Sequence, residues 1–366
     1  MPSLSTATDY FKAMHVASRK RITRYPAAAG SVLLSRFRYG IGPRLHSLFG
    51  LMDQPQETWK NYLLDENCRV VLRRVNQACH REIVNNKLAF YEHCLENGLD
   101  TIPVLCAVDN NASGVQQSGI IISSLDEWKM QLRHCQQSLF IKLIDGSWGK
   151  DAFSAQPSAR GWQYCGYEGG LDEFYAFAMK RFQGQRGWMV QPRIHSHPDL
   201  DKISAPGVLA TIRAVTCIVD GKPELLFATL RIPVGDNITD NFSHGSSGNI
   251  TAPIDPTTGE IGVCRGSINK TWPEIVDVVF HPDTGNRIPG SRIPSWESIR
   301  DLLDRGQRSL PFLRTLGWDI AVTENGPLVV EANATYDVDV IQVSHQHGIG
   351  DVLNPWLEKI DGQFRS

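Results

Sequence analysis

The strongest restriction on the fold comes from residues 318–333, where two apolar runs flank the turn sequence Glu-Asn-Gly-Pro at 324–327. This pattern predicts a β-hairpin, and the length of its loop decides which side chains share a face. A two-residue Asn-Gly loop would put Asp319 and Glu331 on opposite faces. A three-residue Glu-Asn-Gly loop, with its glycine left-handed, would pair Asp319 with Glu331 and place Asn333 on the same face.

Two carboxylates and an amide oxygen on one face are typical of a site for Mg²⁺, with Mn²⁺ as the alternative, because these hard cations take oxygen ligands. Facing acids at Asp319 and Glu331 would repel each other without a cation. An ordinary hairpin with solvated acids on its outer face would carry the same residues. The apolar strand residues around the two acids favour the metal site.

The order of predicted elements indicates an α+β fold of two lobes with a cleft between them. The expected parts are a helical region over 1–80, a first lobe over 81–190, a second lobe with the metal site over 191–350, and a tail over 351–366. Predicted helices cover 82–97, 124–137, 171–182 and 295–305, with Gly98 and Gly306 as stops. Predicted strands cover 101–108, 139–144, 187–194, 211–219, 225–232, 318–323 and 328–333. In the helical region, breaks are expected near 26–30 and 40–43.

Composition and charge narrow the class of protein. The chain has 42% hydrophobic and 21% charged residues, which is typical of a soluble globular protein. A net charge of -2 argues against nucleic-acid binding by the chain as a whole. The eight cysteines form no C-x-x-C motif and are expected to be free thiols of a cytoplasmic protein. No secretory signal and no membrane span are expected.

The charge is uneven, because residues 1–50 form a basic arm with a single acid, Asp9. Its cations are Lys12, Arg19, Lys20, Arg21, Arg24, Arg36, Arg38 and Arg44. Such an arm can contact an acidic carrier protein or an anionic membrane. It can equally be a solvated helical face beside an acidic neighbouring surface.

A lysine at position 142 lies in an apolar predicted strand that leads into the glycine-bearing loop 145–150. A lysine among apolar strand residues suggests that its ammonium group lies beside an anion. The glycines of the loop let backbone N–H groups approach a phosphate closely. The spacing is not that of a Walker A loop. A plain strand-loop turn with a snorkelling lysine would read in the same way.

Several motifs occur in the order found in ATP-grasp proteins. They are Asn86-Lys87-Leu88-Ala89-Phe90-Tyr91, Lys142 with its loop, Val190-Gln191-Pro192-Arg193 followed by His197-Pro198, His281-Pro282-Asp283-Thr284-Gly285, Gly317-Trp318-Asp319, Glu331-Ala332-Asn333 and Asp337-Val338-Asp339-Val340-Ile341-Gln342. With them the sequence resembles the sugar-transfer-associated branch of the ATP-grasp family over residues 40–350. The resemblance implies an ATP-grasp fold, with ATP between two α+β lobes and a helical region in front.

The resemblance also implies which residues contact ATP. Lys87 and Lys142 would hold the phosphates, and a flexible loop would close over them. The adenine would be read by the backbone of a hinge, with a histidine beside it. The loop residues are Gly146, Ser147, Trp148 and Gly149, the hinge residues are Gln191, Pro192, Arg193 and Ile194, and the histidine is His197.

Catalysis and metal binding are implied for a second set. Arg213, Arg231 and Lys142 would contact the transferred phosphoryl group or an acyl phosphate, a role that suits the bidentate fork of arginine. Asp319, Glu331 and Asn333 would bind Mg²⁺. Histidines in the matched loops are read more simply as local hydrogen-bonding groups than as catalysts.

The implied activity is ATP-dependent ligation of a small-molecule carboxylate to an amine, or to a thiol, through an acyl phosphate with release of ADP and phosphate. A kinase acting on a hydroxyl or a sugar, and a non-catalytic nucleotide-binding module, are the alternatives. The acceptor pocket is expected near Tyr336, Asp337, His244 and the helical region. One departure concerns Gly317, which stands where many ATP-grasp ligases carry an arginine. A second is the helical character of the first 80 residues.

Overall fold

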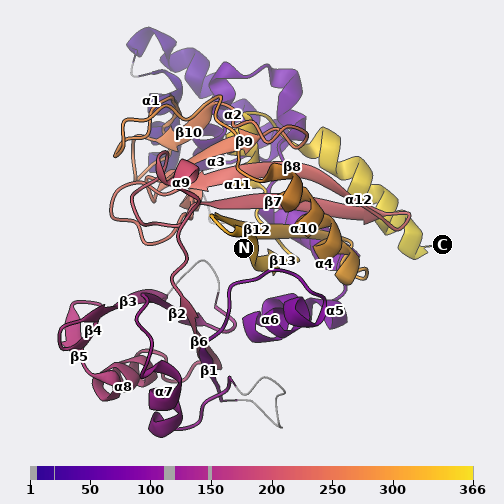
Figure 1. Cartoon of the computed structure of the whole chain (residues 1–366). Coiled ribbons are helices and arrows are strands. Elements are labelled where there is room, and N and C mark those ends of the chain that lie inside the picture. Colours follow the sequence, from indigo (N-terminus) through magenta and orange to yellow (C-terminus); the bar gives the residue numbers. More distant parts are fainter. Residues whose placement is uncertain (1–5, 20, 111–119, 147–150, 366) are drawn as a thin grey trace.

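The computed structural model describes residues 6–19, 21–110, 120–146 and 151–365, and it has the predicted α+β architecture. Figure 1 shows one sheet in each of two lobes. Both sheets consist of antiparallel strand pairs. The fold class predicted from the order of elements is therefore confirmed.

The first lobe is built on a six-stranded sheet with the strand order β1-β6-β2-β3-β4-β5. The strands are β1 (Cys106–Asp109), β2 (Leu139–Leu143), β3 (Phe153–Ser158), β4 (Gly161–Tyr164), β5 (Tyr167–Gly169) and β6 (Gly187–Pro192). Helices α7 (Leu125–Leu132) and α8 (Leu171–Arg181) pack on this sheet through an aromatic core that includes Trp128, Phe174 and Trp188. Large aromatic rings such as these bury extensive apolar area, which stabilises the packing of both helices on the sheet.

The second lobe is built on a seven-stranded sheet with the order β11-β10-β9-β8-β7-β12-β13. The strands are β7 (Thr211–Val219), β8 (Lys222–Ile232), β9 (Ile250–Ile254), β10 (Cys264–Ser267), β11 (Ile275–Val278), β12 (Thr315–Thr323) and β13 (Gly326–Asn333). Helix α10 (Trp296–Ser309) belongs to one core cluster of this sheet, whereas α4 (Asp65–Val75) and α12 (Gly350–Arg365) belong to another. The apolar strand residues are thus covered on both sides.

The first 80 residues are helical, as predicted. They form α1 (Ala7–Ala17), α2 (Tyr25–Tyr39), α3 (Pro43–Leu48), α4 and the start of α5 (Ala78–Asn85), with short 3-10 turns at Ile22–Arg24, Leu51–Asp53 and Gln56–Asn61. The break at 40–43 is confirmed, because Gly40 caps α2 in the left-handed conformation. The break at 26–30 is wrong. Pro26 lies in the first turn of α2, where its missing N–H costs nothing.

The predicted hairpin is present, but its loop is different. Glu324 and Asn325 form a two-residue loop, and Thr323 pairs with Gly326. A bulge between the pairs Ile320–Val329 and Asp319–Glu331 then adds one residue to β13, so that Asp319 faces Glu331 as predicted. The expected carboxylate pairing is confirmed, and the three-residue loop is wrong.

Three other predicted elements differ in extent. The strand expected over 101–108 starts only at Cys106, and α7 ends at Leu132 rather than near 137. Helix α10 continues through Gly306 to Ser309, so Gly306 is not its stop. A Cβ at position 306 would lie 2.9 Å from Cη2 of Trp318, which explains a glycine inside this helix.

The lobe boundaries also shift. Strand β6 runs to Pro192, so the first lobe extends past residue 190. Helix α6 (Lys87–Glu96) joins the lobes, because Phe90 packs in the second-lobe core and Leu88 contacts first-lobe residues. The expected tail is instead the ordered helix α12, whose Leu353 is fully buried. Within the described ranges, none of the helices has the length and hydropathy needed to cross a bilayer.

Two glycines inside helices provide a test of this packing. We expect Gly306→Ala to lower the free energy of unfolding, because overpacking a buried site costs about 1–3 kcal/mol, more than the gain of about 1 kcal/mol in helix propensity. Gly30→Ala in α2 is the matched control, since a Cβ there meets no atom within 4 Å. It should raise stability by about 0.5–1 kcal/mol. Denaturant unfolding of both variants measures the difference, and equal stabilisation by the two would contradict the Trp318 contact.

Candidate active site

A cavity of about 1020 Å³ lies between the lobes, and residues of the first lobe, the second lobe and the N-terminal helices line it. Its wall contains Lys87 and Lys142 from one side and Arg213, Asp319 and Glu331 from the other. The structure thus brings these five predicted site residues to one cavity. A cavity of this size matches the range of small-molecule sites.

Lys87 is placed by a break between two helices that sequence periodicity had merged into one. Asn86 has extended backbone angles, and its side chain caps α6 by accepting hydrogen bonds from the amides of Leu88 (3.0 Å) and Ala89 (3.2 Å). The Lys87 amide donates to the carbonyl of Ile144 at 2.9 Å, and its ammonium donates to the carbonyl of Gly146. Lys87 is therefore fixed to the loop that follows β2.

Lys142 lies in β2, where it pairs with Met189 of β6, and it lines the cavity. Burial first and the nearby charge of Lys87 second lower the pKa of its ammonium to about 8, although Glu331 and Asp319 act in the opposite direction. Two lysines this close need an anion between them. The arrangement fits the predicted phosphate contact.

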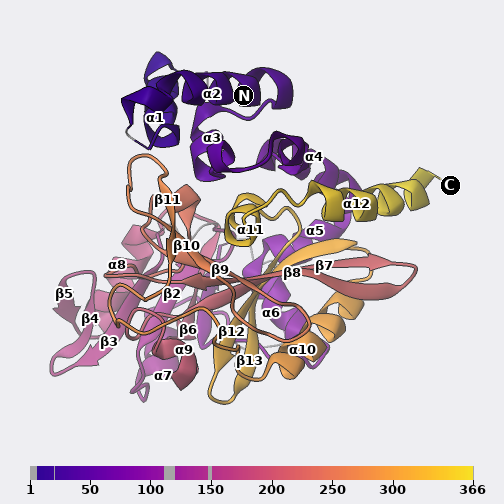
Figure 2. The same cartoon turned by 90° about the horizontal axis from the view of Figure 1, so that it is seen from above.

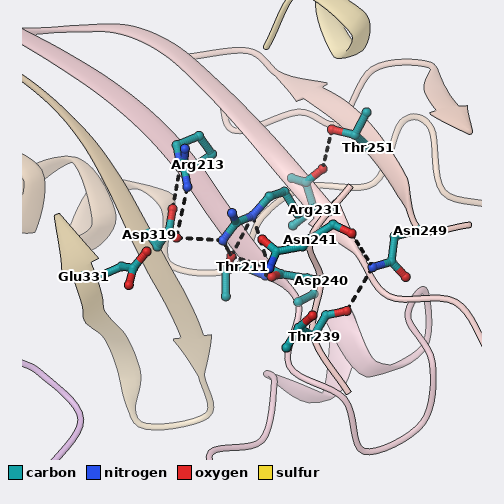
Figure 3. Close-up of polar contacts among 12 residues, drawn as sticks. Thr211, Arg213, Arg231, Thr239, Asp240, Asn241, Asn249, Thr251, Asp319 and Glu331 are labelled. Carbon is teal, nitrogen blue, oxygen red and sulfur yellow. Dashed lines mark hydrogen bonds and ion pairs between the residues drawn. The ribbon is translucent and has the colours of Figure 1, made fainter. Parts of the chain in front are cut away.

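The Asp319 carboxylate is the centre of the opposite wall (Figure 3). It accepts hydrogen bonds from Nε of Arg213 at 2.6 Å and from a terminal nitrogen at 3.2 Å, and Arg231 approaches its second oxygen at 2.9 Å. All three side chains are nearly buried. Burial alone would raise the pKa of the Asp319 carboxyl, but the two arginines outweigh it and hold the pKa far below its usual value.

Sequence reasoning missed the second support of Arg231. Asp240 lies 3.3 Å from Nε of Arg231 and accepts from the amide of Thr211 at 3.1 Å. Asn249 holds the Asp240 loop by donating to the carbonyls of Thr239 and Asn241, each at 2.9 Å (Figure 3). The long loop between β8 and β9, rich in Asn, Asp, Ser and Gly, was the available signal for these residues.

The residues proposed as metal ligands offer the oxygen atoms that a hard cation takes, but they are not equally available to it. Glu331 and Asn333 are only half-buried and hydrogen-bond each other at 3.1 Å beside the cavity. Asp319 already serves two arginines: its Oδ2 faces nitrogens of both Arg213 and Arg231, whereas its Oδ1 accepts from Arg213 alone and keeps a second lone pair. Glu331 and Asn333 are therefore the more available ligands, and Asp319 would contribute a remaining lone pair.

The glycine at position 317 has a steric cause. A Cβ built there would lie 2.5 Å from Cβ of Tyr336. Tyr336 is 2% exposed, and its hydroxyl lies 2.8 Å from that of Thr315. An arginine cannot occupy position 317 in this structure. The ring of Tyr336 packs in the core, and Tyr336 also belongs to the lining of the cavity, so the expected acceptor pocket near it stays a prediction.

The residues expected to form the adenine hinge all lie at the cavity, but not all of their hydrogen-bonding groups are available. Gln191, Pro192, Arg193 and Ile194 line the cavity, and the Gln191 side chain donates to the carbonyl of Ile102 at 3.0 Å. The Arg193 amide already donates to Ser138 at 2.8 Å, so this N–H is not available to adenine.

Two further groups were expected to contact ATP: His197 and the loop that starts at Gly146. His197 does not belong to the described residues that line the cavity, because its Nδ1 accepts from the Asp199 amide at 3.1 Å and caps α9 (Pro198–Asp201). Gly146 is in place, and a Cβ there would approach Leu143 to 2.7 Å. Ser147, Trp148 and Gly149 lie outside the described residues.

Acidic side chains gather at the end of the cavity nearest the N-terminal helices. Nδ1 of His244 lies 3.0 Å from Asp339, and ligand atoms of Asp65, His244 and Asp339 lie within 4.8 Å of one another. Asp337 forms an ion pair with Arg69 of α4. Burial and the charges of Asp339 and Asp337 raise the pKa of Asp65 to about 7. The expected proximity of Asp337, His244 and the helical region is thus confirmed.

Sequence comparison places the chain in a known family. A sequence model for sugar-transfer associated ATP-grasp proteins matches residues 69–360. The chain belongs to this family. The match starts in α4 and ends in α12, so it includes both sheets of the ATP-grasp protein and leaves out α1, α2 and α3.

Solved structures resemble this ATP-grasp protein only distantly. D-alanine–D-alanine ligase from Bacillus anthracis is 11% identical with a TM-score of 0.40, covering 78% of this chain and 70% of its own. D-Ala:D-Ser ligase from Enterococcus faecalis is 9% identical with a TM-score of 0.44, covering 78% and 63%. L-amino acid ligase from Bacillus licheniformis is 12% identical with a TM-score of 0.39, covering 76% and 49%. These values carry no argument about activity. A search of curated proteins found no match.

Removing the Asp319 charge tests the buried network. We expect Asp319→Asn to lower the free energy of unfolding by about 3 kcal/mol, because it leaves two buried arginines without their counter-charge. Glu331→Gln on the facing strand is the control and should change stability by no more than about 0.5 kcal/mol.

The pH dependence gives a second readout of the same pair. Because the folded pKa of Asp319 is depressed, its stabilisation is complete above the ordinary carboxyl pKa of about 4 and is lost as the pH falls through the folded value. The difference between wild type and Asp319→Asn should therefore persist at neutral pH and shrink only in acid. A constant difference down to strongly acidic pH would contradict the assignment.

The buried charge of Lys142 should lower the free energy of unfolding of the protein, although it contributes to the binding of ATP. We expect Lys142→Met to raise the free energy of unfolding at pH 7 by about 2 kcal/mol, allowing for screening by cavity water, and to weaken ATP binding. Since the folded pKa of about 8 lies below the ordinary 10.5, the gain should be full below pH 8 and disappear by pH 10.5. Unfolding at several pH values measures this, with the exposed Lys180→Met as control. Destabilisation by Lys142→Met would contradict a charge buried for binding.

Proposed function

We propose that this protein is an ATP-dependent ligase that joins a carboxylate to an amine through an acyl phosphate and releases ADP and phosphate. The observation that supports the proposal is the arrangement of two lysines on one cavity wall and two acid-fixed arginines on the other. Such paired cations suit a polyphosphate and a phosphoryl group in transfer. The family membership supports ATP as the nucleotide.

In the first step, a carboxylate oxygen attacks the γ-phosphorus, and the bond to the β,γ-bridging oxygen breaks to release ADP. Lys87 and Lys142 bind the phosphates, and the hinge at 191–194 holds the adenine. Glu331 and Asn333, with Asp319, would bind Mg²⁺ or Mn²⁺, which supplies charge neutralisation on the phosphates. Phosphoryl transfer needs such positioning and electrostatic stabilisation more than covalent help from the protein.

In the second step, a neutral amine attacks the acyl carbon, and phosphate leaves with the electron pair of the carbon–oxygen bond. The proton that the nitrogen loses passes to the departing phosphate. Arg213 and Arg231 stabilise the phosphate oxygens in both steps. Their orientation is set in advance, because Asp319 holds both and Asp240 supports Arg231. Donors fixed before reaction avoid the reorganisation that mobile side chains require. The same pair replaces the arginine that cannot fit at Gly317.

Product analysis tests the reaction type. Purified protein receives Mg-ATP and pools of carboxylates and amines, and ADP, AMP and phosphate are quantified, with hydroxylamine added to trap an acyl phosphate as the hydroxamate. We expect ADP, phosphate and hydroxamate in the presence of a carboxylate. Glu331→Gln should reduce turnover at least about 100-fold, because it removes a charge at the metal site. Glu324→Gln in the turn of the same hairpin is the control and should retain activity.

Other products would contradict the proposal in distinct ways. AMP would indicate an acyl adenylate instead of an acyl phosphate. ADP without free phosphate, together with a stable phosphorylated hydroxy compound or sugar, would establish a kinase. ATP binding that persists without turnover in every pool would favour a nucleotide-binding module.

A further inference from the structure

Helix α2 carries apolar residues on two opposite faces, although only one of them is covered. Ala28 and Val32 are fully buried against the neighbouring helices. Leu33 is 45% exposed and Phe37 is 83% exposed. These two residues are four apart and therefore share one face of the helix. Ile22, in the 3-10 turn before α2, is 84% exposed.

Arginines surround this exposed apolar surface. Arg36 and Arg38 flank Phe37 in the sequence, and Arg21 and Arg24 flank the turn that contains Ile22. In the described part of the chain, none of these four arginines has a carboxylate within 4.0 Å, whereas Arg19 pairs with Asp53 at 2.7 Å. Arg19 therefore has an acidic neighbour within this distance, whereas these four arginines have none among the described residues.

The surface lies apart from the proposed reaction. Helices α1 and α2 precede the region matched by the family model, and Figure 2 shows them at the outer side of the molecule, away from both sheets. Of the cations of the basic arm that the structure describes, only Arg44 lines the cavity. Lys12 and Arg44 also lie over the ring of Trp272, at 5.5 and 5.6 Å. Neither use involves the exposed residues of α2.

The combination of charges and apolar groups selects among partners. A second copy of the chain would bring arginines against arginines, which is unfavourable. An acidic protein would satisfy the arginines but gives no reason for the exposed apolar side chains of Ile22, Leu33 and Phe37 near them in the sequence. A helix with apolar residues among arginines suits the head-group region of an anionic bilayer, where both kinds of group gain.

We propose that α2 and the turn before it dock on an anionic lipid surface. Ile22, Leu33 and Phe37 enter the head-group region, and the arginines at 21, 24, 36 and 38 contact lipid phosphates. The interaction is peripheral and reversible, because few side chains take part. It does not depend on the proposed ligase reaction.

Vesicle flotation of the full chain tests the proposal. Wild-type protein should bind phosphatidylglycerol vesicles but not phosphatidylcholine vesicles, and added salt should weaken the binding. The double variant Leu33→Ser with Phe37→Ser should reduce the partition coefficient at least about tenfold. Phe280→Ser is the matched control, since this phenylalanine is 59% exposed outside the docking surface. It should bind as wild type does.

Two double substitutions that remove positive charge, and a measurement of folding, complete the experiment. Arg36→Gln with Arg38→Gln should reduce binding about tenfold, whereas Arg160→Gln with Lys180→Gln, which changes the net charge equally, should not. Circular dichroism and thermal unfolding should be unchanged, because the substituted side chains are exposed.

Three outcomes would overturn the proposal. The first is equal binding to both kinds of vesicle or to neither. The second is tight binding to polyglutamate that does not depend on Leu33 and Phe37, which would indicate an acidic protein partner. The third is a dimer of the wild type that becomes monomeric in the Leu33→Ser, Phe37→Ser variant, which would make the surface an interface between copies.

Discussion

The ion pairs of Asp319 with Arg213 and Arg231 organise the second lobe around the cavity. They join three adjacent strands, because Asp319 lies on β12, Arg213 faces it on β7, and Arg231 lies on β8 opposite Thr211. A slip of one residue in either strand pairing would turn one member of the network to the other face of the sheet. Register, enforced by the apolar residues between these positions, therefore decides whether the cavity has its charged wall.

A buried charge network of this kind contributes little net stability, since desolvation opposes the attraction. Its retention at a cavity wall has a simpler reason. Two arginines fixed in advance can meet the charge of a phosphoryl group without reorganising. Tyr336 occupies the space that a side chain at position 317 would need, and the neighbouring strands supply the cations instead. Under the proposed function, the departure from the usual ligase pattern would move the positive charge rather than remove it.

Helix α6 connects the two lobes and positions Lys87, one of the two lysines of the site. Helix α6 packs into the second-lobe core through Phe90 and Cys94, yet Lys87 at its first turn is bonded to the loop after β2 in the first lobe. Any change in the angle between the lobes moves Lys87 and Lys142 relative to the arginine wall. The N-terminal helices add Arg44 and Arg69 to the same cavity. These two arginines belong to α3 and α4, whereas no described residue of α2 lines the cavity.

The sequence alone determined the α+β class and most helices and strands, because periodicity and turn residues act locally. It predicted that Asp319 faces Glu331, but only for a three-residue loop that the structure does not contain. The family resemblance, rather than periodicity, pointed to Lys87, Lys142, Arg213, Arg231 and the hinge. Only the tertiary structure decided that Asn86 interrupts a helix, that a bulge rather than a three-residue loop sets the hairpin register, and that His197 is a helix cap outside the cavity wall. It also revealed Asp240, Asn249 and the Gly317–Tyr336 contact. The caps at Asn86 and His197 and the bulge are local features, whereas Asp240, Asn249 and the Gly317–Tyr336 contact join different strands and loops. The proximity of the second group is fixed by packing and strand register and leaves no local pattern.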